Sequence, residues 1–238
     1  MLQYYHWPIV QKTRNAIRKI GLLQPLKKVL AKFQKDYEER FAKELINSIQ
    51  PGYTVWDIGA NVGFYTIQFA ERTGNSGTVI AFEPQEEAVA KINDKLKSNG
   101  LENCQVIKCA LSDFEGEAAF SNSGVEANTT GSLVDVENTD SEHSLTLVTK
   151  VDSALGQFQL ALPNVTKIDV EGYEIEVLRG GQQVFSSKES RHIFVEVHFT
   201  RLDQRGFKNP GQEIRDYLTN WGYKTAWTDA SHIHAWRT

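Results

Sequence analysis

Five short segments of the chain are apolar at nearly every position, and helical patterns separate most of them. The strand-like segments are Thr54–Ile58, Thr78–Phe82, Gln105–Leu111, Lys167–Val170 and His192–Val197. Helical spacing is found at Tyr65–Arg72, Glu86–Asn99 and Glu174–Val184. Strands that alternate with helices predict βαβ units and a parallel sheet. Because the strands are apolar almost throughout, we expect helices on both faces of that sheet.

Residues 112–151 follow a different pattern, in which short strand-like pieces are separated by Asn, Ser, Gly and Thr. The pieces are Glu117–Phe120, Ser132–Val136 and Leu145–Val151. We interpret this region, about residues 114–152, as an inserted antiparallel patch with polar turns. Near the end of the chain, Pro210–Trp221 predicts a helix. Tyr223–Trp227 and His232–Trp236 then predict a hairpin.

The first 35 residues form a basic leader, since they hold eight of the 26 Lys and Arg and none of the 30 Asp and Glu. Apolar residues recur in it with helical spacing, and Gly21 and Pro25 divide it into two helices. We expect residues 1–50 to be an N-terminal helical cap or extension on a domain of residues 51–238. A basic amphipathic surface also suits contact with a membrane surface or a lipid-linked substrate, and both interpretations stay open.

Composition narrows the class of protein. The chain has 238 residues, 40% of them hydrophobic and 24% charged, which is typical of a soluble globular domain. We expect no secretory signal, and the sequence has no apolar run of about 18 residues. Cys104 and Cys109 lie five apart in one predicted strand and so on opposite faces, which disfavours a disulfide. We therefore expect a cytoplasmic protein. Because basic residues gather at one end of the chain, we expect no nucleic-acid partner.

The stretch TVWDIGANVGFYTIQFAERTG, residues 54–74, predicts a strand, a tight turn and a helix. Ligands of open α/β sheets bind beyond the carboxyl ends of the strands. Gly59 would let a ligand approach the backbone, and the start of the helix offers free N–H groups. The second strand ends at Glu83, 24 residues after Gly59, where a carboxylate can accept both hydrogens of a ribose diol. These features predict a nucleoside site.

The charge of Asp57 and the absence of two glycines indicate which kind of nucleoside would bind. The dinucleotide pattern G-x-G-x-x-G would require glycine at positions 61 and 64, where this chain has Asn61 and Phe64. Asp57 at the strand end would repel a phosphate but attract a cation. S-adenosyl-L-methionine has no phosphate and carries an ammonium and a sulfonium. We therefore predict this cofactor, with an NAD-dependent oxidoreductase as the alternative.

Five ordered motifs carry a resemblance to a known family. The motifs DIGANVGFYT, VIAFEP, ALSD, KIDVEGYEIEVLRGG and IFVEVH resemble those of the FkbM-type methyltransferases, from about Val55 to His198. That family consists of class I enzymes that depend on S-adenosylmethionine and mostly methylate hydroxyl groups of sugars, polyketides and other secondary metabolites. The resemblance implies an α/β, Rossmann-like fold with a mixed seven-stranded sheet and a C-terminal antiparallel hairpin. It implies O-methylation of a small-molecule or glycan acceptor.

The resemblance also implies roles for individual residues. By position in the first motif, the amino-acid end of the cofactor would be held by Asp57, Gly59, Asn61 and Gly63. Glu83 matches the acid that binds the ribose. Ser112 and Asp113 match the loop near the adenine, where a carboxylate can accept a hydrogen bond from the amino group.

Two further pairs of polar residues end the fourth and fifth strands. Asp169 and Glu171 lie two apart and so on one face, where two acids require a cationic partner. The cofactor, a divalent metal and Lys167 are the alternatives. Since the sequence shows no clear third and fourth oxygen ligand, we expect no metal. Alternatively, Glu171 acts at the N-terminus of the next helix.

Glu196 and His198 also share a face. His198 has the side chain suited to accept a proton near neutral pH, and Glu196 would orient it or bind substrate hydroxyls. We predict Asp169, Glu196 and His198 as the catalytic set, and interpret His192, His232 and His234 as surface or hairpin residues. Substrate choice is expected to depend on Ser121–His143 and Arg201–Lys208. A methyltransferase-like scaffold without catalysis remains a further alternative.

Overall fold

The computed structural model describes residues 40–121, 132–134 and 143–237. Its main sheet has seven strands in the order β10-β11-β9-β8-β1-β2-β3. The strands are β1 (Thr54–Ile58), β2 (Thr78–Phe82), β3 (Cys104–Ile107), β8 (Val165–Ile168), β9 (His192–Glu196), β10 (Lys224–Trp227) and β11 (His232–Trp236). Neighbouring strands in the series β9, β8, β1, β2 and β3 pair in parallel, and β11 is antiparallel to both β9 and β10. The mixed sheet and the hairpin expected from the sequence are confirmed.

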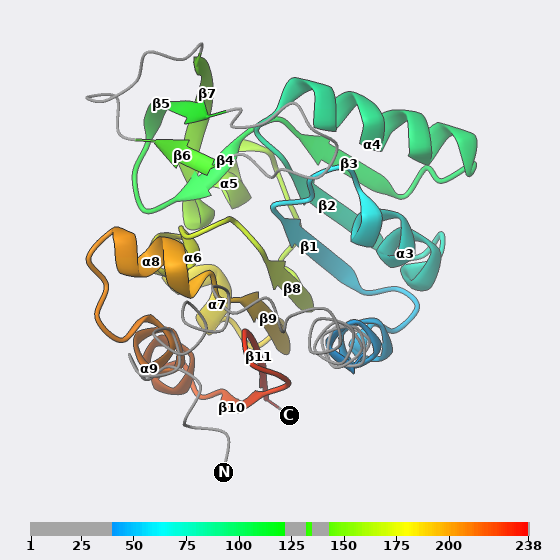
Figure 1. Ribbon diagram of the computed structural model, residues 1–238. Helices are drawn as coiled ribbons and strands as arrows, with labels where there is room; N and C mark the ends of the chain where they lie inside the picture. The colour runs from blue at the N-terminus through cyan, green and yellow to red at the C-terminus, as the bar shows by residue number, and fades with distance from the viewer. Residues whose placement is uncertain (1–39, 122–131, 135–142, 238) are drawn as a thin grey trace, which may run out of the picture.

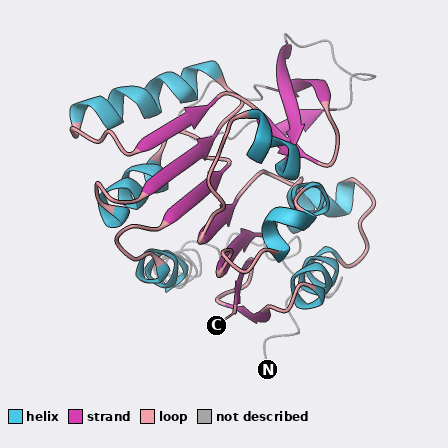
Figure 2. Ribbon diagram, turned by 180° about the vertical axis from the view of Figure 1, so that it is seen from behind, coloured by secondary structure: helices cyan, strands magenta, loops and turns pink. Residues whose placement is uncertain are grey.

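Helices cover both faces of this sheet (Figures 1 and 2). One face is covered by the helix at residues 40–48, α3 (Phe64–Thr73) and α4 (Glu86–Ser98). The other face is covered by α5 (Val151–Gln157), α6 (Glu174–Gly180), α7 (Gln182–Ser186), α8 (Phe199–Gln204) and α9 (Pro210–Asn220). Two of these, α5 and α8, were not expected from the sequence. The predicted helix Glu174–Val184 is in fact α6 and α7, which meet at the glycine pair 180–181.

The two faces of the sheet bury separate hydrophobic clusters. Val55 and Val79 point to the face of α3 and α4, whereas Trp56 and Ile80 point to the face of α6 and α9. This alternation follows from the two-residue period of a strand. Because both faces are buried, apolar residues fill the strands almost without interruption, as the sequence pattern indicated.

A second sheet of four strands packs beside the first, in the order β4-β7-β5-β6. It is formed by β4 (Ala110–Ser112), β5 (Gly116–Ser121), β6 (Ser132–Val134) and β7 (His143–Lys150). The pairs β5–β7 and β5–β6 are antiparallel, as expected for the insertion, and β4 adds a parallel pair with β7. The close approach of α6 holds this sheet in place. A side chain at Gly180 would lie 1.9 Å from the carbonyl oxygen of Ser112.

The predicted strand Gln105–Leu111 was wrong. It is two strands, and β3 belongs to the main sheet while β4 belongs to the second. The chain turns at residues 108–109, where the amide of Cys109 donates to the carbonyl of Ile107 at 3.0 Å. Cys104 and Cys109 therefore do not share a strand, and both are free thiols. Apolar residues occupy both sides of the turn, so the hydrophobic pattern continued across it.

Several expectations concern residues outside the described ranges. The basic leader lies there, as does most of the Asn/Ser/Thr-rich segment Ser121–His143. Among the residues that the structure describes, no helix combines the length and the apolar character needed to cross a bilayer.

Candidate active site

A pocket with about 630 Å³ of empty space, part of it open to solvent, lies at the carboxyl ends of β1, β2 and β8. Gly59 and Asn61 line it from the turn after β1, and Glu83 from the end of β2. Asp169 and Glu171 line it from the end of β8. All five were predicted site residues, and they meet because parallel strands end at one edge of the sheet.

The turn after β1 has no room for a side chain at Gly59. The φ angle of Gly59 is +81°, and a Cβ there would lie 1.8 Å from the carbonyl oxygen of Asp169. The amides of Gly59 and Ala60 both donate to the carbonyl of Phe82, at 3.0 and 3.1 Å. These contacts join the ends of β1, β2 and β8 into one rigid wall of the pocket.

Glu83 is held by two backbone amides. Its Oε2 accepts from the amide of Asn61 at 2.8 Å, and its Oε1 accepts from the amide of Gln85 at 2.9 Å. The residue is 5% exposed, and its burial raises the pKa of the carboxyl to about 7. A carboxylate oxygen has two lone-pair sites, so each oxygen can still accept one hydroxyl hydrogen.

Asp57 does not line the pocket, which disagrees with its predicted contact to the cofactor. It is fully buried on the α3 side of the sheet. There it accepts a hydrogen bond from Thr66 at 2.7 Å and pairs with Lys167 at 3.3 Å. Lys167 also lies 3.2 Å from Asp169. Burial opposes the charge of Lys167, but Asp169 and Asp57 outweigh burial and raise its pKa.

Three other predicted cofactor residues also lie away from the pocket lining. Gly63 precedes α3 with a φ of +79°, and a Cβ there would lie 3.0 Å from Ile92, so its role is close packing of α3 on α4. Ser112 is fully buried, and neither it nor Asp113 lines the pocket. Cys109, Ala110 and Leu111 line it instead. The unpredicted turn at residues 108–109 explains this shift along the chain.

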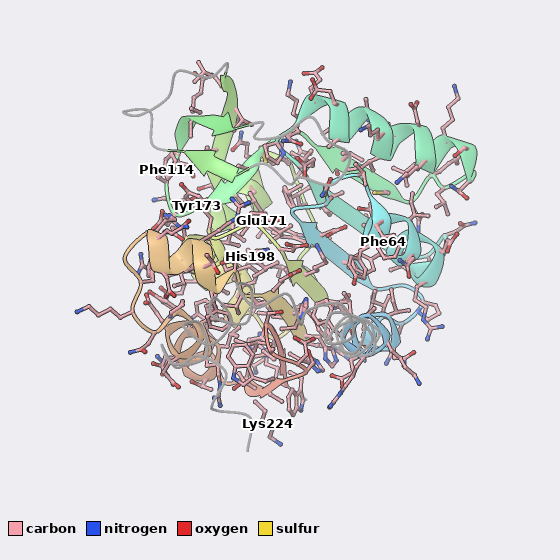
Figure 3. The ribbon with its side chains drawn as sticks, viewed as in Figure 1. Phe64, Phe114, Glu171, Tyr173, His198 and Lys224 are labelled. Atoms are coloured by element: carbon pink, nitrogen blue, oxygen red, sulfur yellow. The ribbon has the colours of Figure 1, made fainter. Side chains whose placement is uncertain are left out.

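His198 lies among four carboxylates just beyond the end of β9. Figure 3 labels His198 and one of these acids, Glu171. Its Nδ1 is 2.8 Å from Oε1 of Glu174. Its Nε2 is 3.3 Å from Glu171, 3.8 Å from Asp169 and 3.9 Å from Glu196. Burial opposes the imidazolium, but Glu174, Glu171 and Asp169 outweigh it and raise the pKa of His198 to about 9. The ring therefore already holds its proton at neutral pH, which disagrees with its predicted role as proton acceptor.

Glu174 was not predicted as a site residue. It is fully buried, and its Oε1 also accepts from the amide of Gly172 at 2.8 Å. In the sequence it is an ordinary acid in the first turn of a helix, so no local signal distinguished it. This N-terminal role had been considered for Glu171. Glu171 instead lines the pocket and pairs with Arg201 at 3.0 Å.

A second pocket, with about 370 Å³ of empty space, is lined by Phe41, Tyr65, Glu196 and His232. His232, interpreted from the sequence as a hairpin residue, lies opposite Glu196 in the register of β11 and β9. Its Nε2 is 3.4 Å from Oε2 of Glu196, while Oε1 of Glu196 faces His198. Glu196 thus belongs to the second pocket and also to the carboxylate cluster around His198.

His192 and His234 lie away from both pockets. Nδ1 of His192 is 3.1 Å from Nε2 of His234, and both rings stack on Phe194. His234 belongs to the C-terminal hairpin, and His192 belongs to the neighbouring strand β9.

Comparison with known proteins gives one family. The methyltransferase FkbM domain matches residues 57–225. A hexuronic acid methyltransferase, AglP of Haloferax volcanii, is 26% identical over 162 residues, which are 68% of this chain and 62% of the relative. The antimetabolite synthetase AmbE of Pseudomonas aeruginosa is 25% identical over an alignment of 236 residues, which covers 80% of this chain but 10% of that protein. This chain therefore spans less than two thirds of either relative.

Among solved structures, a methyltransferase FkbM from Methylobacillus flagellatus has the same fold, with a TM-score of 0.54. It is 14% identical, and the match covers 78% of this chain and 43% of that one.

Proposed function

Because the chain belongs to the FkbM methyltransferase family, we propose that it transfers the methyl group of S-adenosylmethionine to a hydroxyl of a sugar or glycan. The main support for this cofactor is Glu83 at the end of β2. Two backbone amides hold its carboxylate, and lone pairs remain to accept hydrogen bonds from a ribose diol. Asp169 and Glu171 supply negative charge at the same pocket for the ammonium and the sulfonium.

The second pocket suits the acceptor. Phe41 and Tyr65 offer aromatic surface, and Glu196 and His232 offer polar groups for hydroxyls. Such a lining, apolar with a few placed polar groups, is typical of small-molecule sites. The name of the relative AglP, a hexuronic acid methyltransferase, supports a sugar as the acceptor.

The reaction is one in-line displacement. Held beside Gly59, Glu83 and Asp169, S-adenosylmethionine would supply an activated methyl group to the acceptor oxygen and would leave as S-adenosylhomocysteine, with the electron pair of the broken bond on sulfur. The oxygen loses its proton as positive charge develops on it, and one of the carboxylates around His198 would accept that proton. The remaining work of the protein is to hold the two substrates in line.

Calorimetry and methyl transfer test this proposal. S-adenosylmethionine and S-adenosylhomocysteine should bind the purified chain, whereas NADH should not. Radiolabel from the cofactor should then enter glycans or lipid-linked glycans. Binding of NADH alone, or label in RNA or protein, would overturn the proposal. Cofactor binding without transfer to any carbohydrate would favour the scaffold alternative.

Contact of the basic leader with a membrane surface or a lipid-linked substrate stays a prediction. Transfer to a lipid-linked glycan that a chain lacking residues 1–35 performs poorly, with unchanged cofactor affinity, would support it.

A further inference from the structure

Two carboxylates and one imidazole meet where β8 and β9 end. One ligand atom from each of Asp169, Glu196 and His198 lies within 4.8 Å of the others. Nε2 of His198 is 3.8 Å from Oδ1 of Asp169 and 3.9 Å from Oε1 of Glu196. Ligand atoms bound to one divalent ion at about 2.1 Å can lie up to about 4.2 Å apart, so the two distances from Nε2 fit a shared ion. We propose that Asp169, Glu196 and His198 bind a divalent cation.

Each of the three side chains is anchored through its other polar atom. Oδ2 of Asp169 lies 3.2 Å from Nζ of Lys167. Oε2 of Glu196 lies 3.4 Å from Nε2 of His232. The free atoms, Oδ1 and Oε1, face the same ring nitrogen of His198. Metal ligands are held in this way by partners one layer further out, which orient the ligands before the ion binds.

Glu174 provides a second observation, from behind the imidazole. Its side chain is fully buried, and Oε2 has no hydrogen-bond partner among the residues that the structure describes. Its Oε1 lies 2.8 Å from Nδ1 of His198. Because Glu174 accepts from Nδ1, a divalent ion would replace the proton that Nε2 holds without it, and the carboxylate would make that nitrogen a better ligand.

The donor set indicates the kind of ion. One imidazole nitrogen with two carboxylate oxygens suits a divalent transition metal such as Mn²⁺ better than Ca²⁺ or Mg²⁺, which prefer oxygen alone. The side chains of Asp169, Glu196 and His198 are 25%, 35% and 17% exposed, so an ion can enter from solvent. Glu171, 3.3 Å from Nε2 of His198, adds a further carboxylate on the same side.

The position of the site suggests its use. Asp169 lines the cofactor pocket and Glu196 lines the second pocket, so the cation would lie between them. There it would bind the acceptor hydroxyl and lower its pKa, which eases loss of the proton during methyl transfer. This role rests on the function proposed above, whereas the cation site itself does not. The sequence had suggested no metal because it showed no clear third and fourth oxygen ligand, and the imidazole of His198 had been counted as a proton acceptor.

A Mn²⁺ titration of the EDTA-treated full chain, followed by electron paramagnetic resonance, tests the site. We expect one bound Mn²⁺ per chain. Glu196→Gln and His198→Gln should abolish saturable binding, and Glu174→Gln should weaken it by about 10- to 100-fold. The controls Glu87→Gln and Asp94→Asn change exposed acids of α4 and should bind as the unmodified chain does. Glu196 is partly exposed, so its variant should keep the fold, which circular dichroism checks.

Three results would overturn the cation site: no saturable binding, binding of several ions without stoichiometry, or full binding by both Glu196→Gln and His198→Gln. Calorimetry with S-adenosylmethionine in EDTA keeps this test separate from the proposed function, because the cofactor pocket should bind without the ion. For the role, methyl transfer should stop in EDTA and return with Mn²⁺. Transfer that EDTA leaves unchanged would overturn the role.

Discussion

Asp57 and Lys167 lie opposite each other on the neighbouring parallel strands β1 and β8, and their side chains form a buried ion pair at 3.3 Å. Nζ of Lys167 also lies 3.2 Å from Oδ2 of Asp169, so one ammonium links the first strand to the wall of the cofactor pocket. An acid that the sequence suggested as a cofactor ligand is therefore part of the support beneath the site.

Lys167→Met should destabilise the fold strongly. It leaves the carboxylate of Asp57 buried without its cation, and loss of one partner of a buried pair costs about 3–5 kcal/mol. The free energy of unfolding, measured by urea denaturation, should fall by that amount. The control Lys97→Met removes an exposed lysine of α4 and should change stability by less than about 0.5 kcal/mol. Equal losses of unfolding free energy in the two variants would show that the buried ion pair does not contribute more to stability than an exposed lysine does.

Glu83→Gln should weaken cofactor binding. The glutamine amide group brings its own donors toward the amides of Asn61 and Gln85, and it has one acceptor oxygen where the carboxylate has two. Since a hydrogen bond to a charged group contributes about 1.5–3 kcal/mol, the Kd for S-adenosylmethionine should rise about 10- to 100-fold in calorimetry. Glu87→Gln is the control, because it changes an exposed acid in α4 that does not line the pocket. An unchanged Kd for Glu83→Gln would exclude Glu83 from the ribose site.

The raised pKa of Glu83 predicts a pH dependence of nucleoside binding. The carboxyl has a pKa of about 7 in the fold against an ordinary 4.5, so it loses its charge as the pH falls through about 7. A ribose diol donates best to the ionised form, and affinity should therefore fall toward acid pH, by up to about tenfold per unit well below 7. 5′-Methylthioadenosine is the probe, because it has no group of its own that titrates near neutrality. A flat profile, or the same slope in Glu83→Gln, would contradict this assignment.

Gly59→Ala should disrupt the pocket wall. The left-handed backbone alone costs a non-glycine residue about 1–3 kcal/mol, and here the added Cβ would also lie 1.8 Å from the carbonyl oxygen of Asp169. Gly100→Ala is the matched control, because Gly100 also has a positive φ, of +65°, but nothing lies within 4 Å of its Cβ position. Urea unfolding should show a larger loss of stability for Gly59→Ala than for Gly100→Ala. Equal losses would mean that the close contact relaxes without cost.

Tyr65→Leu should affect the acceptor and spare the cofactor. Tyr65 lines the second pocket and does not line the first. Loss of one aromatic contact costs about 0.5–1.5 kcal/mol, so the KM for the carbohydrate acceptor should rise about 2- to 10-fold. The Kd for S-adenosylmethionine should stay the same. Tyr65→Phe, which keeps the ring, and Tyr217→Leu in α9 serve as controls. A changed cofactor affinity with an unchanged KM would remove the second pocket from the acceptor site.

The hydrophobic pattern was sufficient for the main sheet and for part of the site. Strand and helix alternate in the chain, and a parallel sheet places the carboxyl ends of its strands at one edge. Gly59, Glu83, Asp169 and Glu171 stand at those ends, so their meeting at one pocket followed from local spacing alone. The turn at residues 108–109 was missed because apolar residues continue through it.

The contacts between side chains depended on the tertiary structure. The sequence alone determined the alternation of strands and helices along most of the main sheet and the positions of acids and glycines at the strand ends, because these depend on local periodicity and turn chemistry. Only the fold decided that Asp57 pairs with Lys167, that Glu174 lies behind His198, and that His232 lies opposite Glu196. Each of these contacts joins residues from different elements, and the register between elements is set by packing of the whole core.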